Sequence, residues 1–297
     1  MRLAAVDIGS NTVHSLVAEV VRGRLEDVAH YIEMPELGVQ VARTGVIGSR
    51  ARPALRALRR VVDQAKAHGC DRLIAGATHA VRQAADGRAF VREAGALIGV
   101  PVQVISAARE AELSFRGVAS RHAGRREWVM VDLGGASTEI VVAAGKEPLR
   151  SATLALGSGV LAAKFLSDPP TAAERARLRR AALRELAHAP DGEVERLVAT
   201  GGTASNLPLL MTRRNPPTVL TTADLLTCEA RLDGARAARV AEVVGLPANR
   251  VRAMRAGVEA LLLLLDWYGL AVFQISVEGL RHGMLLAYLA TGEDWWR

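Results

Sequence analysis

The chain contains Ala5-Val6-Asp7-Ile8-Gly9-Ser10-Asn11-Thr12 near its start and Met130-Val131-Asp132-Leu133-Gly134-Gly135-Ala136-Ser137-Thr138 about half a chain later. In each copy an apolar run ends in an aspartate, a glycine turn follows, and a second apolar run returns, His14–Val21 or Thr138–Ala143. Apolar runs bounded by such turns are typical of strands. A duplication of this kind predicts two similar lobes that face each other across a ligand-binding cleft.

Outside these stretches, strand-like and helix-like segments alternate, which indicates the α/β fold class. Leu55, Leu58, Val61, Val62 and Ala65 repeat at the spacing of an amphipathic helix. Further strands are expected at Leu73–Ala75, Val102–Ile105, Val194–Ala199 and Val272–Ile275, and further helices at Val251–Tyr268 and Leu280–Leu289. We expect domain I to comprise residues 1–126 and 284–297, and domain II to comprise residues 127–283.

The composition is that of a globular protein. Half of the 297 residues are hydrophobic and 23% are charged, which argues against disorder. No apolar run is long enough to span a bilayer, and the early acid Asp7 argues against a secretory signal peptide. The two cysteines, Cys70 and Cys228, lack metal-ligand spacing. We therefore expect a cytoplasmic protein without a membrane partner, a disulfide scaffold or a zinc site.

The formal net charge is +7, and only three of the 38 basic residues are lysines. A GC-rich genome favours arginine codons, whereas arginine also suits a polyanionic partner because its guanidinium group pairs with phosphate oxygens. One arginine-rich stretch fits either a path for a long polyanion or a solvated helix face. It contains Arg43, Arg50, Arg52, Arg56, Arg59 and Arg60. Nucleic acid is not expected as a partner, because no recognised binding module accompanies the charge.

The repeated pattern has a chemical interpretation. Glycines let backbone N–H groups approach a phosphate, Ser and Thr add donors, and the aspartate can hold Mg²⁺ directly or through water. An ordinary β-turn favours the same residues, so a single copy is weak evidence for a phosphate site. The occurrence of two copies is what favours such a site. A third segment, Thr200-Gly201-Gly202-Thr203-Ala204-Ser205, fits a simple strand–helix turn or a loop that lies against a nucleotide.

Five segments, taken in order, resemble the exopolyphosphatase/guanosine pentaphosphate phosphatase (Ppx/GppA) family, a branch of the actin-like phosphotransferases. They are Ala4–Val20, Gly76–Ala84, Ile105–Val118, Val131–Glu139 and Ile275–Gly283. The resemblance implies two actin-like, ribonuclease H-like α/β lobes with the active site in the cleft between them.

The resemblance also implies roles for single residues. Glu110 falls on the proposed general base and Arg82 on the phosphate-clamping arginine. The acidic positions around Mg²⁺, with Mn²⁺ as the alternative metal, are Asp7, Asp132 and Glu139. The phosphate-binding positions are Gly9, Ser10, Asn11 and Thr12 in the first loop and Gly134, Gly135, Ser137 and Thr138 in the second. Gly201 and Gly202 of the third segment are added as phosphate-binding candidates from its own sequence pattern. Each has a structural alternative, such as a surface arginine for Arg82.

The activity that the resemblance implies is hydrolysis of the terminal phosphoanhydride of inorganic polyphosphate, with release of orthophosphate. Hydrolysis of guanosine pentaphosphate (pppGpp) uses the same site, and a sensor that binds without turnover is the non-enzymatic alternative. A kinase or chaperone ATPase is disfavoured by Glu110 in its family context. A homodimer is left open.

The chain departs from the family pattern at three places. Ala136 replaces a usual glycine, Ala107-Ala108-Arg109 replaces a segment with glycine and an acid, and His282 replaces a common glutamate. The second departure bears on the flexibility of the segment before Glu110.

Overall fold

The computed structural model describes residues 1–211 and 217–297, without the side chain of Arg125. It divides into two compact units. Unit 1 contains Met1–Gly117 and Glu278–Arg297, and unit 2 contains Val118–Val277. In the described ranges, no helix is both long and apolar enough to cross a membrane.

Unit 1 is built on a five-stranded sheet with the strand order β3-β2-β1-β4-β5. The strands are β1 (Arg2–Ile8), β2 (Val13–Val21), β3 (Arg24–Glu33), β4 (Arg72–Ala77) and β5 (Val102–Val104). Strand β1 pairs antiparallel with β2 and parallel with β4. The central strand β1 therefore carries the first repeated stretch directly into the turn that follows it.

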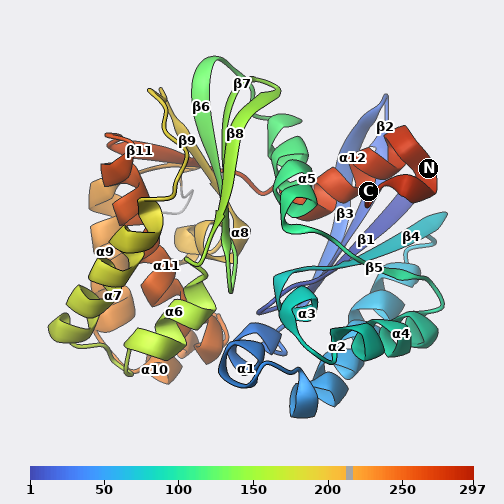
Figure 1. Cartoon of the computed structure of the whole chain (residues 1–297), viewed down its shortest axis with the longest axis horizontal. Coiled ribbons are helices and arrows are strands. Elements are labelled where there is room, and N and C mark those ends of the chain that lie inside the picture. Colours follow the sequence, from blue (N-terminus) through green and yellow to red (C-terminus); the bar gives the residue numbers. More distant parts are fainter. Residues whose placement is uncertain (212–216) are drawn as a thin grey trace. The chain divides into compact units, whose positions relative to one another are not determined.

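Alternate side chains of β1 enter two different cores, as the period of a strand requires. Val6 and Ile8 pack with one set of helices, and Leu3 and Ala5 pack with another (Figure 1). The first set contains α1 (Leu37–Thr44), α2 (Ala51–Lys66), α3 (His79–Gln83) and α4 (Gly87–Ile98). The second contains α5 (Ala107–Ala119) and α12 (Leu280–Thr291). The predicted apolar repeat of α2 is buried, from Leu55 to Ala65.

Glycines bring α5 and α12 into close contact. A Cβ atom on Gly283 would overlap the carbonyl of Leu113, and one on Gly117 would overlap the carbonyl of Gly279. The two backbones can approach this closely only because no side chain stands between them.

Unit 2 is built on a six-stranded sheet with the strand order β10-β11-β9-β6-β7-β8. The strands are β6 (Gly124–Leu133), β7 (Thr138–Gly145), β8 (Glu147–Leu154), β9 (Leu197–Thr200), β10 (Val219–Thr221) and β11 (Val272–Ile275). Strand β6 pairs antiparallel with β7 and parallel with β9. This is the arrangement of β1 between β2 and β4, so the sequence duplication corresponds to a structural one.

The helices of unit 2 surround α11 (Ala248–Trp267), most of whose residues are buried. The others are α6 (Ser158–Phe165), α7 (Ala172–Leu186), α8 (Gly201–Ala204), α9 (Thr222–Asp233) and α10 (Ala237–Val244). Short 3₁₀ turns occur at Gly48–Arg50, Leu207–Leu210 and Gly292–Asp294.

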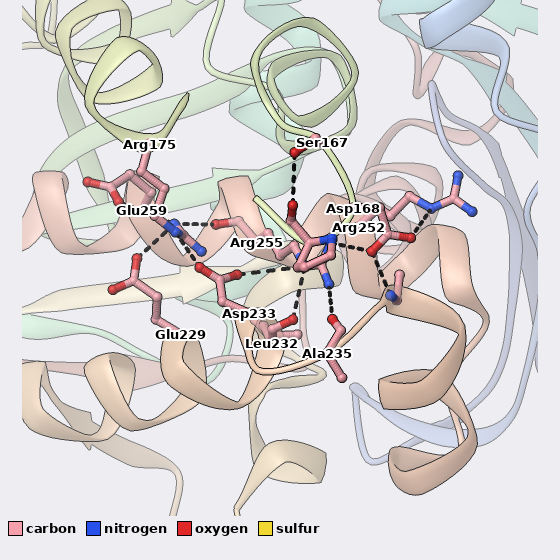
Figure 2. A network of polar contacts seen from close by, with 12 residues as sticks. Ser167, Asp168, Arg175, Glu229, Leu232, Asp233, Ala235, Arg252, Arg255 and Glu259 are labelled. Carbon is pink, nitrogen blue, oxygen red and sulfur yellow. Dashed lines mark hydrogen bonds and ion pairs between the residues drawn. The ribbon is translucent and has the colours of Figure 1, made fainter. Parts of the chain in front are cut away.

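A polar network joins α7, α9 and α11 to the segment after α6 (Figure 2). Arg175 of α7 contacts Asp233 at 2.5 Å and Glu229 at 2.7 Å. Arg255 of α11 donates to Asp168 at 2.8 Å and to the carbonyls of Leu232 and Ala235 at 3.0 and 2.7 Å. The network therefore holds α11 against α7, α9 and the segment after α6.

Candidate functional site

The first predicted phosphate loop is a tight turn between β1 and β2. The N–H of Gly9 donates to the carbonyl of Thr12 at 2.9 Å. The carbonyl of Ser10 accepts from the N–H of Gly38 at 2.6 Å, and that of Asn11 accepts from the N–H of Glu36 at 3.1 Å. The N-terminal end of α1 therefore supports the loop from behind and holds its backbone in one conformation.

The second predicted phosphate loop has the same construction in unit 2. The N–H of Gly134 donates to the carbonyl of Ser137 at 3.0 Å. The carbonyl of Gly134 accepts from Ser158 N and Oγ, both at 3.0 Å, and that of Gly135 accepts from Gly159 N at 2.9 Å. A helix N-terminus, here that of α6, again supports the loop. Ser137 and Thr138 are buried.

The two loops differ in the residue opposite the aspartate. Asp132 faces Glu139 across β6 and β7, whereas Asp7 faces His14 across β1 and β2. The Asp7 carboxylate also lies 3.7 Å from Nη1 of Arg281 on α12. Unit 2 thus places two carboxylates opposite each other, and unit 1 places one carboxylate beside a guanidinium.

The third loop, which begins at Thr200, lies beside Asp132 in unit 2. Thr200 is the neighbour of Asp132 on the adjacent strand, and Gly201 follows with a φ of +91°. A Cβ atom on Gly201 would lie 3.0 Å from Oδ1 of Asp132 and 2.5 Å from the carbonyl of Leu133. The structure therefore brings Gly201 against the Asp132 carboxylate.

The carboxylates of Asp132 and Glu139 suit a magnesium ion. In residues 1–211 and 217–297, no group of three or more His, Cys, Asp and Glu side chains is placed to enclose a metal. Mg²⁺ does not require such a cage, since it commonly keeps several waters and binds one or two carboxylates together with substrate phosphates. Asp132 and Glu139 are the two carboxylates that suit this role, and Asp7 as a third ligand stays a prediction.

The predicted arginine and base form an ion pair in unit 1. Nη1 of Arg82, on α3, donates to Oε2 of Glu110 at 2.9 Å and to the carbonyl of Ile105 at 2.6 Å. The Arg82 side chain is 18% exposed and that of Glu110 is 9% exposed. Both side chains are therefore largely withdrawn from water and lie in direct contact. The surface-arginine alternative for Arg82 is therefore wrong.

Helix α5 places Glu110 one turn from its start. Oγ of Ser106 accepts from the N–H of Arg109 at 3.1 Å, which caps the helix. The N–H of Ile105 donates to the carbonyl of Ala77 at 2.9 Å, at the end of β4. The ends of two parallel strands thus position α3 and α5, and with them Arg82 and Glu110.

Arg250 is a buried arginine that the sequence analysis missed. It lies in the first turn of α11 and is 8% exposed. A Cβ atom on Gly202 would overlap its Nη1, so the guanidinium lies against the third loop. In the described part of the chain, no carboxylate pairs with it, and burial lowers its pKa. An anion beside Gly202 would stabilise this charge.

A sequence signal for Arg250 existed. Arg250 precedes Met254, Gly257 and Leu261 at the spacing of one helix face, and all three are buried. An arginine at a core-facing position of a long apolar helix is unusual enough to mark a candidate site.

A sequence profile of the Ppx/GppA phosphatase family matches residues 16–291. The chain belongs to the Ppx/GppA phosphatase family. This confirms the resemblance on which the site assignments depend.

Solved Ppx/GppA structures share the fold over nearly the whole chain. One Aquifex aeolicus family member is 25% identical, with a TM-score of 0.80 and 99% of each chain covered. A type II variant of the A. aeolicus Ppx/GppA phosphatase is 26% identical, with a TM-score of 0.75 and coverages of 97% and 99%. An exopolyphosphatase from Cytophaga hutchinsonii is 21% identical, with a TM-score of 0.88 and 98% coverage of each chain. These likenesses confirm the two-lobed actin-like α/β fold.

Two departures from the Ppx/GppA pattern are explained by local packing. The backbone of Ala136 packs directly against Gly157, where a Cβ atom would overlap it. The close contact at this turn therefore depends on Gly157, and position 136 itself accepts an alanine. Arg109 donates to the carbonyl of Trp295 at 2.5 and 3.2 Å and to Glu112 at 2.6 Å. These bonds tie the start of α5 to the C-terminal segment of unit 1.

His282, the third departure, belongs to a cluster that crosses unit 1. Its Nε2 contacts Oδ1 of Asp27 at 2.9 Å, and His30 contacts Oδ2 at 2.9 Å. His30 also lies 3.3 Å from Nε2 of His14. Burial raises the pKa of Asp27, but the bonds from His282 and His30 outweigh it and hold that pKa well below its usual range. The histidine thus fastens the start of α12 to β3.

Proposed function

We propose that this Ppx/GppA chain is an exopolyphosphatase, which hydrolyses the terminal phosphoanhydride of inorganic polyphosphate and releases orthophosphate. The observation that carries the proposal is the Arg82–Glu110 ion pair, at 2.9 Å and largely withdrawn from water. It joins a phosphate-binding cation to an ionised carboxylate, the two groups that water attack on a phosphoryl group requires.

Glu110 acts as the general base. The contact with Arg82 orients its carboxylate, which accepts a proton from a water molecule in line with the terminal phosphorus. The oxygen of that water forms the new P–O bond, the bridging P–O bond breaks, and the electron pair stays on the oxygen of the shortened chain. A positioned base of this kind contributes about 10²–10⁴-fold.

Arg82 has a second role during the reaction. When a terminal phosphate oxygen binds its guanidinium, the positive charge of Arg82 neutralises the negative charge that develops on the phosphoryl group. The backbone and hydroxyl groups of Ser10, Asn11 and Thr12 in unit 1, and of Ser137 in unit 2, supply donors for phosphate oxygens. The predicted Thr138 hydroxyl is not one of these donors, because it is buried and donates to the carbonyl of Leu156 at 3.1 Å.

Mg²⁺ is the proposed cofactor, with Asp132 and Glu139 as the residues that would hold it. When bound, it would neutralise charge on the phosphate oxygens. Gly201 supports this assignment, because its missing side chain lets the third loop approach Asp132.

The test compares Glu110→Gln with Glu112→Gln on the same helix. The Glu112 side chain is 53% exposed and bonded to Arg109, so this control removes the same charge away from Arg82. With long-chain polyphosphate and Mg²⁺, we expect orthophosphate release to fall about 10²–10⁴-fold in Glu110→Gln and to change little in the control. Polyphosphate binding should persist in both.

The outcomes separate the alternatives. Equal activity in Glu110→Gln and wild type would remove Glu110 from the mechanism. If wild type hydrolyses pppGpp and leaves polyphosphate intact, the substrate is pppGpp and the exopolyphosphatase proposal is wrong. Binding of polyphosphate without release of orthophosphate would favour the sensor.

A further inference from the structure

The net positive charge of the chain lies in one segment of unit 1. Residues 50–92 contain ten arginines and lysines and three aspartates, so their formal charge of +7 equals that of the whole chain. The rest of the sequence is neutral in sum. General codon bias does not explain this concentration, because the other 28 basic residues are matched by acids.

Part of this charge is neutralised within the fold. Arg82 pairs with Glu110, Arg60 pairs with Glu33 at 2.7 Å, and Arg59 pairs with Asp63 at 2.8 Å. Arg59 and Arg60 are therefore excluded from the predicted polyanion path, because each is already paired with a carboxylate.

Lys66 donates to the carbonyl of Ile98 at 2.8 Å and Arg72 to that of Asp71 at 3.1 Å. The other five exposed arginines of the segment are called the arginine face. They are Arg50, Arg52, Arg56, Arg88 and Arg92. Among the residues that the structure describes, none of their guanidinium groups takes part in an ion pair or side-chain hydrogen bond.

Four residues of the arginine face lie on two neighbouring helices, α2 and α4, which pack on the same side of the sheet (Figure 1), and Arg50 lies in the 3₁₀ turn just before α2. Asp86, just before α4, accepts from the N–H groups of Ile47 and Gly48 at 2.8 and 2.9 Å. This bond holds the start of α4 against the turn that leads into α2. Arg88 follows Asp86 by two residues, and Arg50 follows Gly48 by two residues.

The arginines on each helix are four residues apart, so they share one helix surface. Arg52 and Arg56 form such a pair on α2, and Arg88 and Arg92 form one on α4. Like charges at this spacing repel each other and destabilise the helix, whereas a bound polyanion would relieve the repulsion. Arg88 follows Arg82 by only six residues along the chain.

We propose that the arginine face binds the part of a linear polyphosphate chain that extends beyond the phosphates at Arg82. The inference rests on the proposed function and adds to it a binding surface for long substrates. The only Phe, Tyr or Trp in residues 50–92 is Phe90, which is buried. Since single-stranded nucleic acids bind largely by stacking on exposed aromatic rings, the face suits a polyanion without bases.

The experiment measures binding of fluorescently labelled long-chain polyphosphate as a function of salt. We expect Arg52→Gln/Arg56→Gln to lower the slope of log affinity against log salt by about 1.4, that is, about 25-fold in affinity at 0.1 M salt. Arg88→Gln/Arg92→Gln should act similarly. Tripolyphosphate hydrolysis should not change in either variant.

The matched control is Arg59→Gln/Arg60→Gln, which removes the same charge from the same helix at positions already paired with carboxylates. An equal loss of long-chain binding in this control would mean that only total charge matters, and would overturn the proposal. So would unchanged binding in both arginine-face variants. Oligothymidylate that competes as strongly as polyphosphate, at equal phosphate concentration, would assign the face to nucleic acid instead.

The binding assay is independent of turnover. If wild type binds long chains through the arginine face but releases no orthophosphate, the proposed function fails and the surface stands. If wild type hydrolyses polyphosphate and the variants bind it normally, the proposed function stands and the surface fails.

Discussion

Replacing Arg255 with methionine removes a fully buried charge from the network in unit 2. The side chain is 1% exposed and donates to the carbonyls of Leu232 and Ala235 and to Asp168. Methionine has a similar volume but no donor, so the buried carbonyl of Leu232 and the half-buried carbonyl of Ala235 lose a partner, at up to about 1–3 kcal/mol each. With the loss of the charge partner of Asp168, we expect unit 2 to be destabilised by about 3–5 kcal/mol.

The assay is urea denaturation followed by circular dichroism. For a slope of about 2 kcal/mol per molar urea, the transition should move down by about 1.5–2.5 M. The matched control is Arg252→Met, since Arg252 lies 3.8 Å from the same aspartate and its side chain is 58% exposed. An exposed pair of this kind contributes below about 1 kcal/mol. Equal shifts in the two variants would refute the account of Arg255 as a buried connector.

Three further predictions address the other contacts. Gly283→Ala should destabilise unit 1 by about 1–3 kcal/mol in thermal melts, because the new methyl group meets the carbonyl of Leu113; an unchanged melting temperature would contradict the close helix contact. The lowered pKa of Asp27 contributes stability that is present above about pH 4 and is lost as the pH falls below it. The difference in unfolding midpoint between wild type and Asp27→Asn should therefore shrink from pH 7 to pH 3, and a constant difference would argue against the linkage. Arg250→Met should raise the unfolding midpoint, since it removes a buried charge without a carboxylate partner in the described chain, and should weaken pyrophosphate binding measured by calorimetry; retained binding would exclude Arg250 from the phosphate site.

The parts of the fold that sequence could predict are those determined by local chemistry. The turns after Asp7 and Asp132 depend on glycine and hydroxyl residues within a few positions, and their hydrogen bonds have the same pattern in both copies. The apolar spacing of α2 likewise depends on one helix alone. Such features need no knowledge of distant contacts.

The contacts that sequence did not predict join distant parts of the chain. Asp27 and His282 are 255 residues apart, and neither carries a local pattern that points to the other. Arg82 and Glu110 were assigned separate roles by resemblance, and only the fold places them in one ion pair. Whether Arg59 binds a polyanion or neutralises Asp63 also depends on side-chain direction, which composition does not determine.

The division of unit 1 between the two ends of the sequence has a consequence for synthesis on the ribosome. Its second core needs Leu280, Met284 and Trp295 to cover Leu3 and Ala5. Until that segment emerges, one face of the β1 sheet stays uncovered, while residues 118–277 form a continuous unit that can already fold. The nascent chain therefore carries an exposed apolar surface until residues 280–295 are synthesised, and a chaperone that holds the first 117 residues would raise the yield of native protein more than one that acts on unit 2.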